Sequence, residues 1–234
     1  MDFIIEDAIF NKYPNYICGF IAAKNVDNAG TSGELLAMIK AAQEEIKSQM
    51  TLENLSQNPF IRNWRDIYSS FKAQPSKFKA SSEALIRRTL KGDEIPHINK
   101  LVDIYNYISL KYRTPVGGED ISKITSPVWL KFAKGNERFI KLGETEDDPI
   151  EAGEVVYIDA SDSVLCRRWN WRESETTKLT EETKDAILVI DATAPLTAES
   201  VMAATKELAD LVRKFCGGAR QVALLSNKER KVSF

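Results

Sequence analysis

Side chains able to bind charged and aromatic ligands gather in the stretch VLCRRWNWRESETTKLT. In an extended strand Trp169 and Trp171 would share one face, and large apolar patches of this kind are uncommon on solvated surfaces. The guanidinium groups of Arg168 and Arg172 fork toward phosphate or carbonyl oxygens. Glu173 could bind an amino group or orient a water. The alternative is a structural cluster, in which salt-bridged arginines support an inter-strand aromatic pair.

The chain contains one histidine, His97, and this restricts the available mechanisms. A serine–histidine–aspartate relay would need His97 itself, and no serine or cysteine pattern near it supports that role. A histidine-rich metal cage is excluded, and the three cysteines form no C-x-x-C pair. No G-x-G-x-x-G or G-K-[ST] phosphate loop occurs, so we expect no metal, no dinucleotide and no other cofactor. Catalysis would depend on carboxylates, backbone N–H donors or the substrate.

The charges of the chain nearly cancel, since 32 basic residues stand against 34 acidic ones. Any binding of RNA would therefore need a local basic patch. Arg87, Arg88 and Lys91 are the candidates, with Lys77 and Lys79 before them, and a solvated helix face is the competing interpretation. The N-terminus lacks the basic region of a signal peptide, and no apolar run approaches the roughly 18 residues that span a bilayer. We expect a cytoplasmic protein without a membrane partner.

Helices are predicted in the first half of the chain, where apolar residues recur at helical spacing behind polar residues that can cap a first turn. The predicted helices are 32–50 with Ser32 as cap, 52–71 with an aromatic stripe, 81–92 with Ser81 or Ser82 as cap, and 99–112 with Asn99 as cap. Residues 72–80, with Pro75 and three lysines, are expected to form an exposed loop.

Strands dominate the second half, where short apolar runs alternate with turn residues. The predicted strands are 3–10 and 16–23, which could form a hairpin, and then 128–133, 138–143, 154–159, 164–169, 186–192 and 221–226, with a helix at 197–215 between the last two. The segment TPVGGED is predicted to be a turn. Helices grouped before strands indicate an α+β fold, and we expect one domain over residues 1–234, helix-rich at first and strand-rich after.

A family resemblance is carried by SSEALIRRTLKGDEIPHINKLVDIYNYISLKYRTPVGGEDISKI and EAGEVVYIDASDSVLCRRWNWRESETTKLTEET. Over roughly residues 60–192 the chain resembles freestanding B3/B4-type proteins, which are similar to the editing and tRNA-binding domain of the phenylalanyl-tRNA synthetase β subunit. The most specific part is INKLVDIYNYISL followed by TPVGGEDISKI. The resemblance implies a three-layered α+β arrangement around a β-sandwich of unusual topology.

The resemblance also assigns positions in an editing pocket. Ala192 aligns with the small residue that limits the amino-acid pocket in the synthetase, and the family glutamate falls near Glu173 or Glu175. Gly117 stands where the synthetase has a histidine, so a histidine-dependent mechanism is not expected. The glycine-rich strand of the synthetase is replaced by residues 166–172, which make the pocket cationic and aromatic.

The resemblance implies a trans-acting deacylase that hydrolyses mischarged aminoacyl-tRNA. Glu173 would be catalytic, with backbone N–H groups of Gly117 and Gly118 as donors to the oxyanion. One of the two indoles would stack on the terminal adenine. The expected substrate-binding residues are Arg168, Trp169, Asn170, Trp171, Arg172 and Ala192. Two alternatives remain open: a non-catalytic tRNA- or RNA-binding module, and a small-molecule enzyme acting on an amino-acid derivative.

Overall fold

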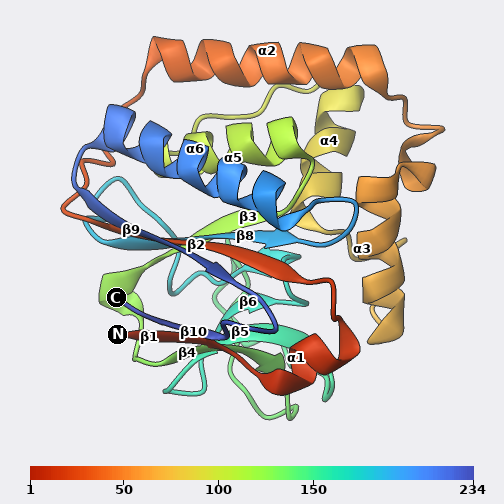
Figure 1. Cartoon of the computed structure of the whole chain (residues 1–234), viewed down its shortest axis with the longest axis vertical. Coiled ribbons are helices and arrows are strands. Elements are labelled where there is room, and N and C mark those ends of the chain that lie inside the picture. Colours follow the sequence, from red (N-terminus) through yellow and green to blue (C-terminus); the bar gives the residue numbers. More distant parts are fainter.

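Two β-sheets lie face to face, and helices cover the outer face of one of them (Figure 1). The computed structural model describes all 234 residues. From top to bottom in Figure 1, a layer of helices is followed by a four-stranded sheet and then by a six-stranded sheet. The predicted α+β class and its three layers are therefore confirmed.

Five of the six helices end by Tyr112 and eight of the ten strands begin at Val116 or later, so the first half is helix-rich and the second strand-rich, as predicted. The strands are β1 (Asp2–Ile5), β2 (Ile17–Lys24), β3 (Val116–Asp120), β4 (Val128–Phe132), β5 (Val155–Asp159), β6 (Val164–Arg167), β7 (Arg172–Glu173), β8 (Ala186–Ala192), β9 (Ala219–Leu225) and β10 (Lys231–Ser233). The helices are α1 (Asp7–Lys12), α2 (Gly33–Gln49), α3 (Pro59–Ser70), α4 (Ser81–Leu90), α5 (Lys100–Tyr112) and α6 (Ala198–Cys216), with short 3-10 turns at Leu55–Gln57 and Ile121–Lys123.

The four-stranded sheet, in the order β3-β8-β2-β9, separates two hydrophobic cores. Because side chains alternate along a strand, Leu188 and Ile190 of β8 pack toward the helices, whereas Ile187 and Val189 face the other sheet. On the helical side, α6 lies so close to β2 that a Cβ at Gly19 would be 2.1 Å from Oγ1 of Thr205. Glycine at this position permits the layers to approach.

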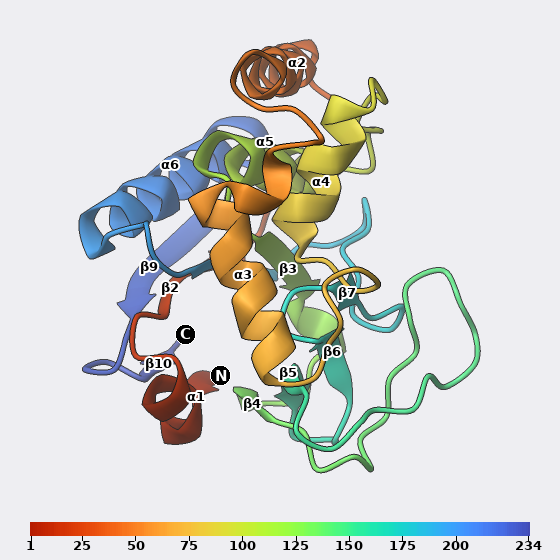
Figure 2. The same ribbon diagram turned by 90° about the vertical axis from the view of Figure 1, so that its right-hand side faces the viewer.

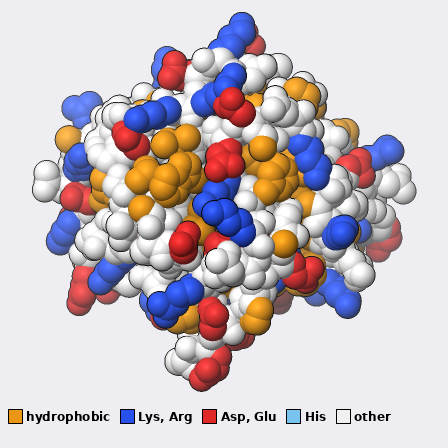
Figure 3. All heavy atoms as spheres, turned by 90° about the horizontal axis from the view of Figure 1, so that it is seen from below, with side chains coloured by type: hydrophobic (Ala, Val, Ile, Leu, Met, Phe, Trp, Pro, Cys, Tyr) orange, Lys and Arg blue, Asp and Glu red, His pale blue; other side chains and the backbone are white.

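The six-stranded sheet, in the order β10-β1-β4-β5-β6-β7, encloses the second core with its inner face. β1 lies between β4 and β10, so the two ends of the chain are neighbours in one sheet. Asp2 is paired with Ser233, and the N-terminal amine of Met1 donates to the carbonyl of Phe234 at 2.6 Å. The outer face of this sheet carries acidic and basic side chains around several apolar groups (Figure 3).

Two of the three predicted polar caps are present at the start of their helices. Ser32 accepts a hydrogen bond from the Leu35 amide at α2, and Asn99 accepts one from the Val102 amide at α5. The prediction for α4 was wrong, because its capping position is Ala80 and no side chain caps this end. No helix combines the length and the apolar character needed to cross a membrane.

Three apolar or glycine-rich segments fold differently from their predicted states. Residues 7–12 form α1 instead of extending β1, and β1 and β2 belong to different sheets, so no hairpin forms. Val116–Asp120 is not a turn, because it forms β3 and pairs with β8 at the edge of its sheet. Residues 138–143 form only isolated bridges and no strand.

Candidate functional site

A small inner cavity and an open cleft lie next to each other where the N-terminal end of α4 approaches β3 and β7. The inner cavity has a volume of about 30 Å³ and the outer cleft one of about 460 Å³. Ser81, Val116 and Glu173 line both, so the two spaces are adjacent. Figure 2 shows the segment between α3 and α4 passing beside β7, where it forms one wall of the cleft.

Two glutamates from distant segments meet in the inner cavity. Glu119 lies on the face of β3 that looks toward the other sheet, and it is only 7% exposed. Glu173 ends β7, and its carboxyl group lies beside that of Glu119 in the cavity. Gly117 leaves room for this contact, since a Cβ there would lie 2.5 Å from Oε1 of Glu173. The Oε2 atoms of both glutamates are buried without a hydrogen-bond partner.

The pairing perturbs the protonation of both carboxyl groups. Burial, and then the neighbouring Glu173, raise the pKa of Glu119 well above its usual range. Burial also raises the pKa of Glu173. Because ionising one buried carboxyl group raises the cost of ionising its neighbour, the pair favours keeping one proton. Tyr105 of α5, which lines the cleft, has its phenol pKa raised by burial and then by Glu173 and Glu119.

Asp191 of β8 fixes the wall of the cavity opposite the glutamates. Its Oδ1 accepts hydrogen bonds from the hydroxyls of Tyr16 and Tyr157 at 2.6 Å each, and from Nε1 of Trp169 at 3.2 Å. Its Oδ2 accepts from Nδ2 of Asn170 at 3.1 Å. Burial raises the pKa of this carboxyl, while the same hydrogen bonds oppose the shift. Four donors converging on one buried carboxylate hold the cavity wall rigid.

The stretch that contains the two tryptophans is a turn, and residues 168–171 connect β6 to β7. Arg168 and Trp169 have φ values of 50° and 66°, in a backbone region that few non-glycine residues adopt. The predicted extended strand with both indoles on one face was therefore wrong. The turn instead sends Trp169 inward and leaves Trp171 half-buried at the cleft.

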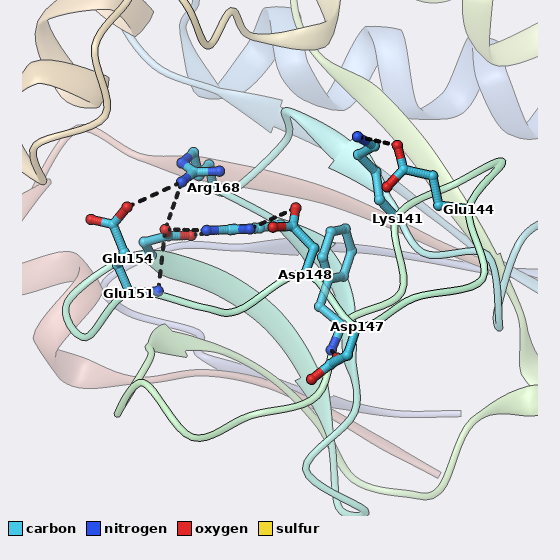
Figure 4. A network of polar contacts seen from close by, with 9 residues as sticks. Lys141, Glu144, Asp147, Asp148, Glu151, Glu154 and Arg168 are labelled. Carbon is cyan, nitrogen blue, oxygen red and sulfur yellow. Dashed lines mark hydrogen bonds and ion pairs between the residues drawn. The ribbon is translucent and has the colours of Figure 1, made fainter.

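Arg168 supports this turn and is not free to bind phosphate. Its guanidinium is 5% exposed, lies 2.9 Å from Oε1 of Glu154 and stacks 3.8 Å from the centroid of the Phe78 ring. Figure 4 shows Arg168 directed toward Glu154, with Glu151 beside it. Arg167 binds the same carboxylate through two nitrogens, both at 2.9 Å. The prediction that Arg168 binds substrate is corrected, because Glu154 neutralises its charge.

Trp169 is also structural. It is fully buried, and its ring packs edge-on against Tyr13, Tyr16 and Trp64 at centroid distances of 4.8–5.2 Å. No face remains for stacking on adenine, which corrects that prediction for Trp169 and leaves Trp171 as the candidate. Asn170 lines the cavity, but both ends of its amide group have partners within the protein. Its Nδ2 donates to Asp191, and its Oδ1 accepts a hydrogen bond from the Tyr68 hydroxyl at 3.0 Å.

The sheet register distinguishes the two glycines of β3. The amide of Asp191 donates to the carbonyl of Pro115, and that of Ile121 donates to Asp185, so odd-numbered residues of β3 exchange hydrogen bonds with β8. The Gly117 amide consequently points into the sheet, whereas the Gly118 amide points to its open edge. The predicted donor role of Gly117 is wrong for this reason, and that of Gly118 stays a prediction.

Ala192 does not limit the cavity. It is fully buried and paired with Ile17, on the opposite face of β8 from Asp191. Asp191 and Val189 line the cavity in its place. The predicted role of Ala192 in limiting the pocket is therefore corrected, because neighbouring residues of a strand face opposite sides of the sheet.

Basic residues border the outer cleft, though not all of those predicted. Lys77, Lys79, Arg88 and Arg172 line it together with Trp171. Arg87 instead donates to Glu83 at 2.8 Å, and Lys91 is exposed beyond the cleft. Of the basic residues predicted to bind RNA, Lys77, Lys79 and Arg88 thus lie at the cleft, together with Arg172, which was predicted to bind substrate. His97 pairs with Asp103 at 2.6 Å, away from both spaces.

Comparison with known proteins matches this chain to one domain family and to subunits of one kind of tRNA ligase. A family model described as the B3/4 domain matches residues 63–217. The phenylalanine–tRNA ligase beta subunit of Haemophilus influenzae (strain 86-028NP) is 31% identical over 119 residues, which are 50% of this chain and 14% of that protein. The same subunit from strain ATCC 51907 / DSM 11121 / KW20 / Rd is 38% identical over 64 residues, 27% of this chain and 8% of that protein.

One solved structure was also matched over most of the chain. It is the crystal structure of an N-terminal fragment of the phenylalanyl-tRNA synthetase beta subunit from Pyrococcus horikoshii, with a TM-score of 0.48 and 15% sequence identity. The match covers 93% of this chain and 49% of that one. The chain thus spans 14% or less of the ligase subunits it matches in sequence.

Proposed function

Since this chain belongs to the B3/4 domain family, we propose that it hydrolyses the ester of a mischarged aminoacyl-tRNA supplied in trans. Its relatives in sequence are named as subunits of phenylalanine–tRNA ligases, and this supports a role connected with tRNA. The hydrolytic activity itself is inferred from the site.

The observation that carries the proposal is an acidic cavity that lies beside a basic cleft and shares three lining residues with it. An aminoacyl-tRNA has a cationic amino group at its end and phosphates a few atoms away. Glu119 and Glu173 suit the first, and Lys77, Lys79 and Arg88 suit the second. The charges of the two spaces therefore follow the polarity of this substrate.

Individual groups of the cleft fit the steps of ester hydrolysis. Trp171 presents a ring on which the terminal adenine can stack, and such stacking contributes about 1–3 kcal/mol per base. Arg172 can hold a phosphate or the substrate carbonyl, and the Gly118 amide can donate to the oxyanion. Glu173 also lines the outer cleft of about 460 Å³, where a water that it holds has room beside the ester.

A deacylation panel tests the proposal. The purified protein is incubated with tRNAs carrying correct and incorrect amino acids, and released amino acid is measured. We expect at least one mischarged tRNA to be hydrolysed, with Glu173→Gln lowering the rate about 100-fold or more. Glu175→Gln is the matched control, because Glu175 pairs with Lys178 and lies outside the cavity. Failure to release any amino acid from the panel would refute the hydrolytic function.

The basic border of the cleft also supports a second candidate, a tRNA-binding module without catalysis. Lys77, Lys79, Arg88 and Arg172 would serve this role equally. The same panel separates the two candidates, because a binding module retards tRNA in a gel and leaves every ester intact.

A further inference from the structure

We propose that Glu119 and Glu173 together form a receptor for a primary ammonium group, the α-amino group of an aminoacyl substrate. This inference rests on the proposed function only in assigning the ammonium to an aminoacyl ester. The receptor itself can be tested with amines that carry no ester.

The orientation of the two carboxyl groups is the first reason. Both side chains face the inner cavity, and each has one oxygen, Oε2, that is buried and accepts no hydrogen bond. Unpartnered buried oxygens of this kind are rare in folded proteins and need a partner. An ammonium group offers three donors and fits two carboxylates at once.

The charges around the pair are the second reason. The charges of Asp191 on β8 and Asp120 on β3 disfavour added negative charge there, and the neighbouring Tyr105 and Cys166 side chains carry no positive charge. The cation that lowers the pKa of Glu173 is Arg172 of β7, and Arg172 is exposed to solvent. The inner cavity therefore attracts a cation.

The size of the cavity is the third reason. At about 30 Å³ it holds a group of the size of one or two waters, which matches an ammonium head and excludes an amino-acid side chain. The side chain and the ester would remain in the outer cleft of about 460 Å³. The site would thus identify the amino end of its substrate and leave the side chain in a roomier, less selective space.

Binding would exchange one cation for another. In the empty site the two carboxyl groups share one proton, and the incoming ammonium takes its place, so that each amine bound releases one proton to solvent. Amine affinity should consequently rise with pH, up to the pH at which the pair loses its proton unaided or the amine becomes neutral.

Calorimetry of the intact chain tests this directly. The probes are glycinamide, L-alaninamide and L-phenylalaninamide, with 3-phenylpropanamide as the matched ligand that lacks the amine. Titration at pH 7 in buffers of different ionisation enthalpy reports proton release. We expect the amides to bind with release of a proton, and 3-phenylpropanamide to bind about tenfold more weakly or worse. Equal binding of the two phenyl compounds, absence of amide binding, or binding without proton release would overturn the proposal.

Substitutions localise the effect. Glu119→Gln and Glu173→Gln should each weaken amide binding about tenfold or more and abolish proton release, and Glu175→Gln should leave both unchanged. Carbon-13 NMR of labelled glutamate carboxyls in the unsubstituted protein provides a measurement that needs no variant. It should show two coupled groups that lose their protons in separate steps, and independent titration at ordinary values would contradict the shared proton.

A tRNA experiment separates this inference from the proposed function. If the protein deacylates an aminoacyl-tRNA, the same tRNA with its amino group acetylated should be hydrolysed about tenfold more slowly or worse. Equal rates would overturn the ammonium receptor and leave the deacylase standing. Binding of the amides without hydrolysis of any tRNA would do the reverse.

Discussion

At the scale of single residues, the pair of Glu119 and Glu173 makes the free energy of unfolding depend on pH. Burial raises the pKa of Glu119 in the folded protein, and unfolding returns it to its ordinary value of 4.5. Between these two values the folded state holds a proton that the unfolded chain has lost. The contribution to stability is therefore fully present below about pH 4.5 and lost as pH rises toward the folded pKa.

We expect Glu119→Gln to remove this loss, because glutamine is neutral at every pH. Its advantage in unfolding free energy over the unsubstituted protein should grow between pH 5 and pH 8, by at most about 1.4 kcal/mol per pH unit. Denaturant unfolding at both values measures it. Asp191 is present in both proteins, so its own titration largely cancels in the difference. An advantage that stays constant with pH would contradict the shared proton.

The two tryptophans of the turn should respond in opposite ways. Trp169→Ala removes a fully buried ring and is expected to lower the unfolding free energy by about 3–5 kcal/mol. Trp171→Ala removes a half-buried ring at the cleft and should mainly weaken tRNA binding. Unfolding curves and gel retardation of the two variants check this. A Trp171→Ala protein that binds tRNA normally would remove the stacking role.

Sequence reasoning reached some of these residues and missed others. It singled out Glu173 correctly as a member of the cavity, but not Glu119, which lay inside a segment predicted to be a turn. Only the pairing of β3 with β8 and the short β7 brings the two carboxyls together. Ala192 was misplaced for a related reason, since which of two neighbouring strand residues faces a cavity depends on which sheet faces lie inward.

At the scale of elements, one carboxylate holds the turn between β6 and β7. Glu154 is buried and binds both Arg167 and Arg168. Glu154→Gln would leave Arg167 with only the partly exposed Asp148 and Arg168 with only the exposed Glu151, and we expect a loss of about 3–5 kcal/mol in unfolding free energy. Glu151→Gln is the control, because Glu151 is mostly exposed and lies 3.6 Å from Arg168. Similar losses for both variants would show that burial of the pair is unimportant.

The two glycines of β3 should separate activity from folding. A Cβ at Gly117 meets only the flexible carboxyl end of Glu173, so Gly117→Ala should displace that side chain and impair amide binding at little cost in stability. A Cβ at Gly118 would lie 2.3 Å from Leu188 and 2.9 Å from a backbone oxygen, and Gly118→Ala should cost about 1–3 kcal/mol. Thermal melts and calorimetry compare them, and a well-folded Gly118→Ala protein would contradict the packing argument.

Elements with local signals were predictable and those fixed by tertiary contacts were not. Ser32 and Asn99 cap α2 and α5 by accepting hydrogen bonds from amides three residues ahead, so these helix starts could be predicted without knowing any distant contact. Residues 7–12 are apolar enough to suit a strand, and only the packing of Ile9 and Phe10 in the core between the sheets makes them a helix. β3 carries two glycines and follows a proline, so its local pattern indicated a turn that pairing with β8 overrides.

At the scale of the whole molecule, basic and acidic residues nearly cancel, so the net charge does not attract tRNA. We therefore expect tRNA to bind at the local group of basic residues that borders the outer cleft. The face in Figure 3 mixes both signs, whereas Lys77, Lys79, Arg88 and Arg172 border the cleft. We expect the logarithm of tRNA affinity to fall linearly with the logarithm of salt concentration. Each of Lys77→Gln, Lys79→Gln and Arg88→Gln should reduce that slope by about 0.7–0.9, whereas Lys228→Gln, outside the cleft, should not. Equal slopes in all four variants would place binding elsewhere.

The family resemblance proposed from the sequence is confirmed by the match of residues 63–217 to the B3/4 domain. It anticipated the three layers, which composition and periodicity alone could not, because strand order depends on contacts between distant segments. The extent of the domain as residues 1–234 stays a prediction.

The pairing of the first and last strands has a mechanical consequence. β1 and β10 are antiparallel neighbours, with Met1 beside Phe234 at the same end of the ladder. A force that pulls residues 1 and 234 apart would load the β1–β10 hydrogen bonds one after another, as in opening a zipper. In this direction the molecule should therefore yield at low force, and β10 should detach before the acidic cavity deforms.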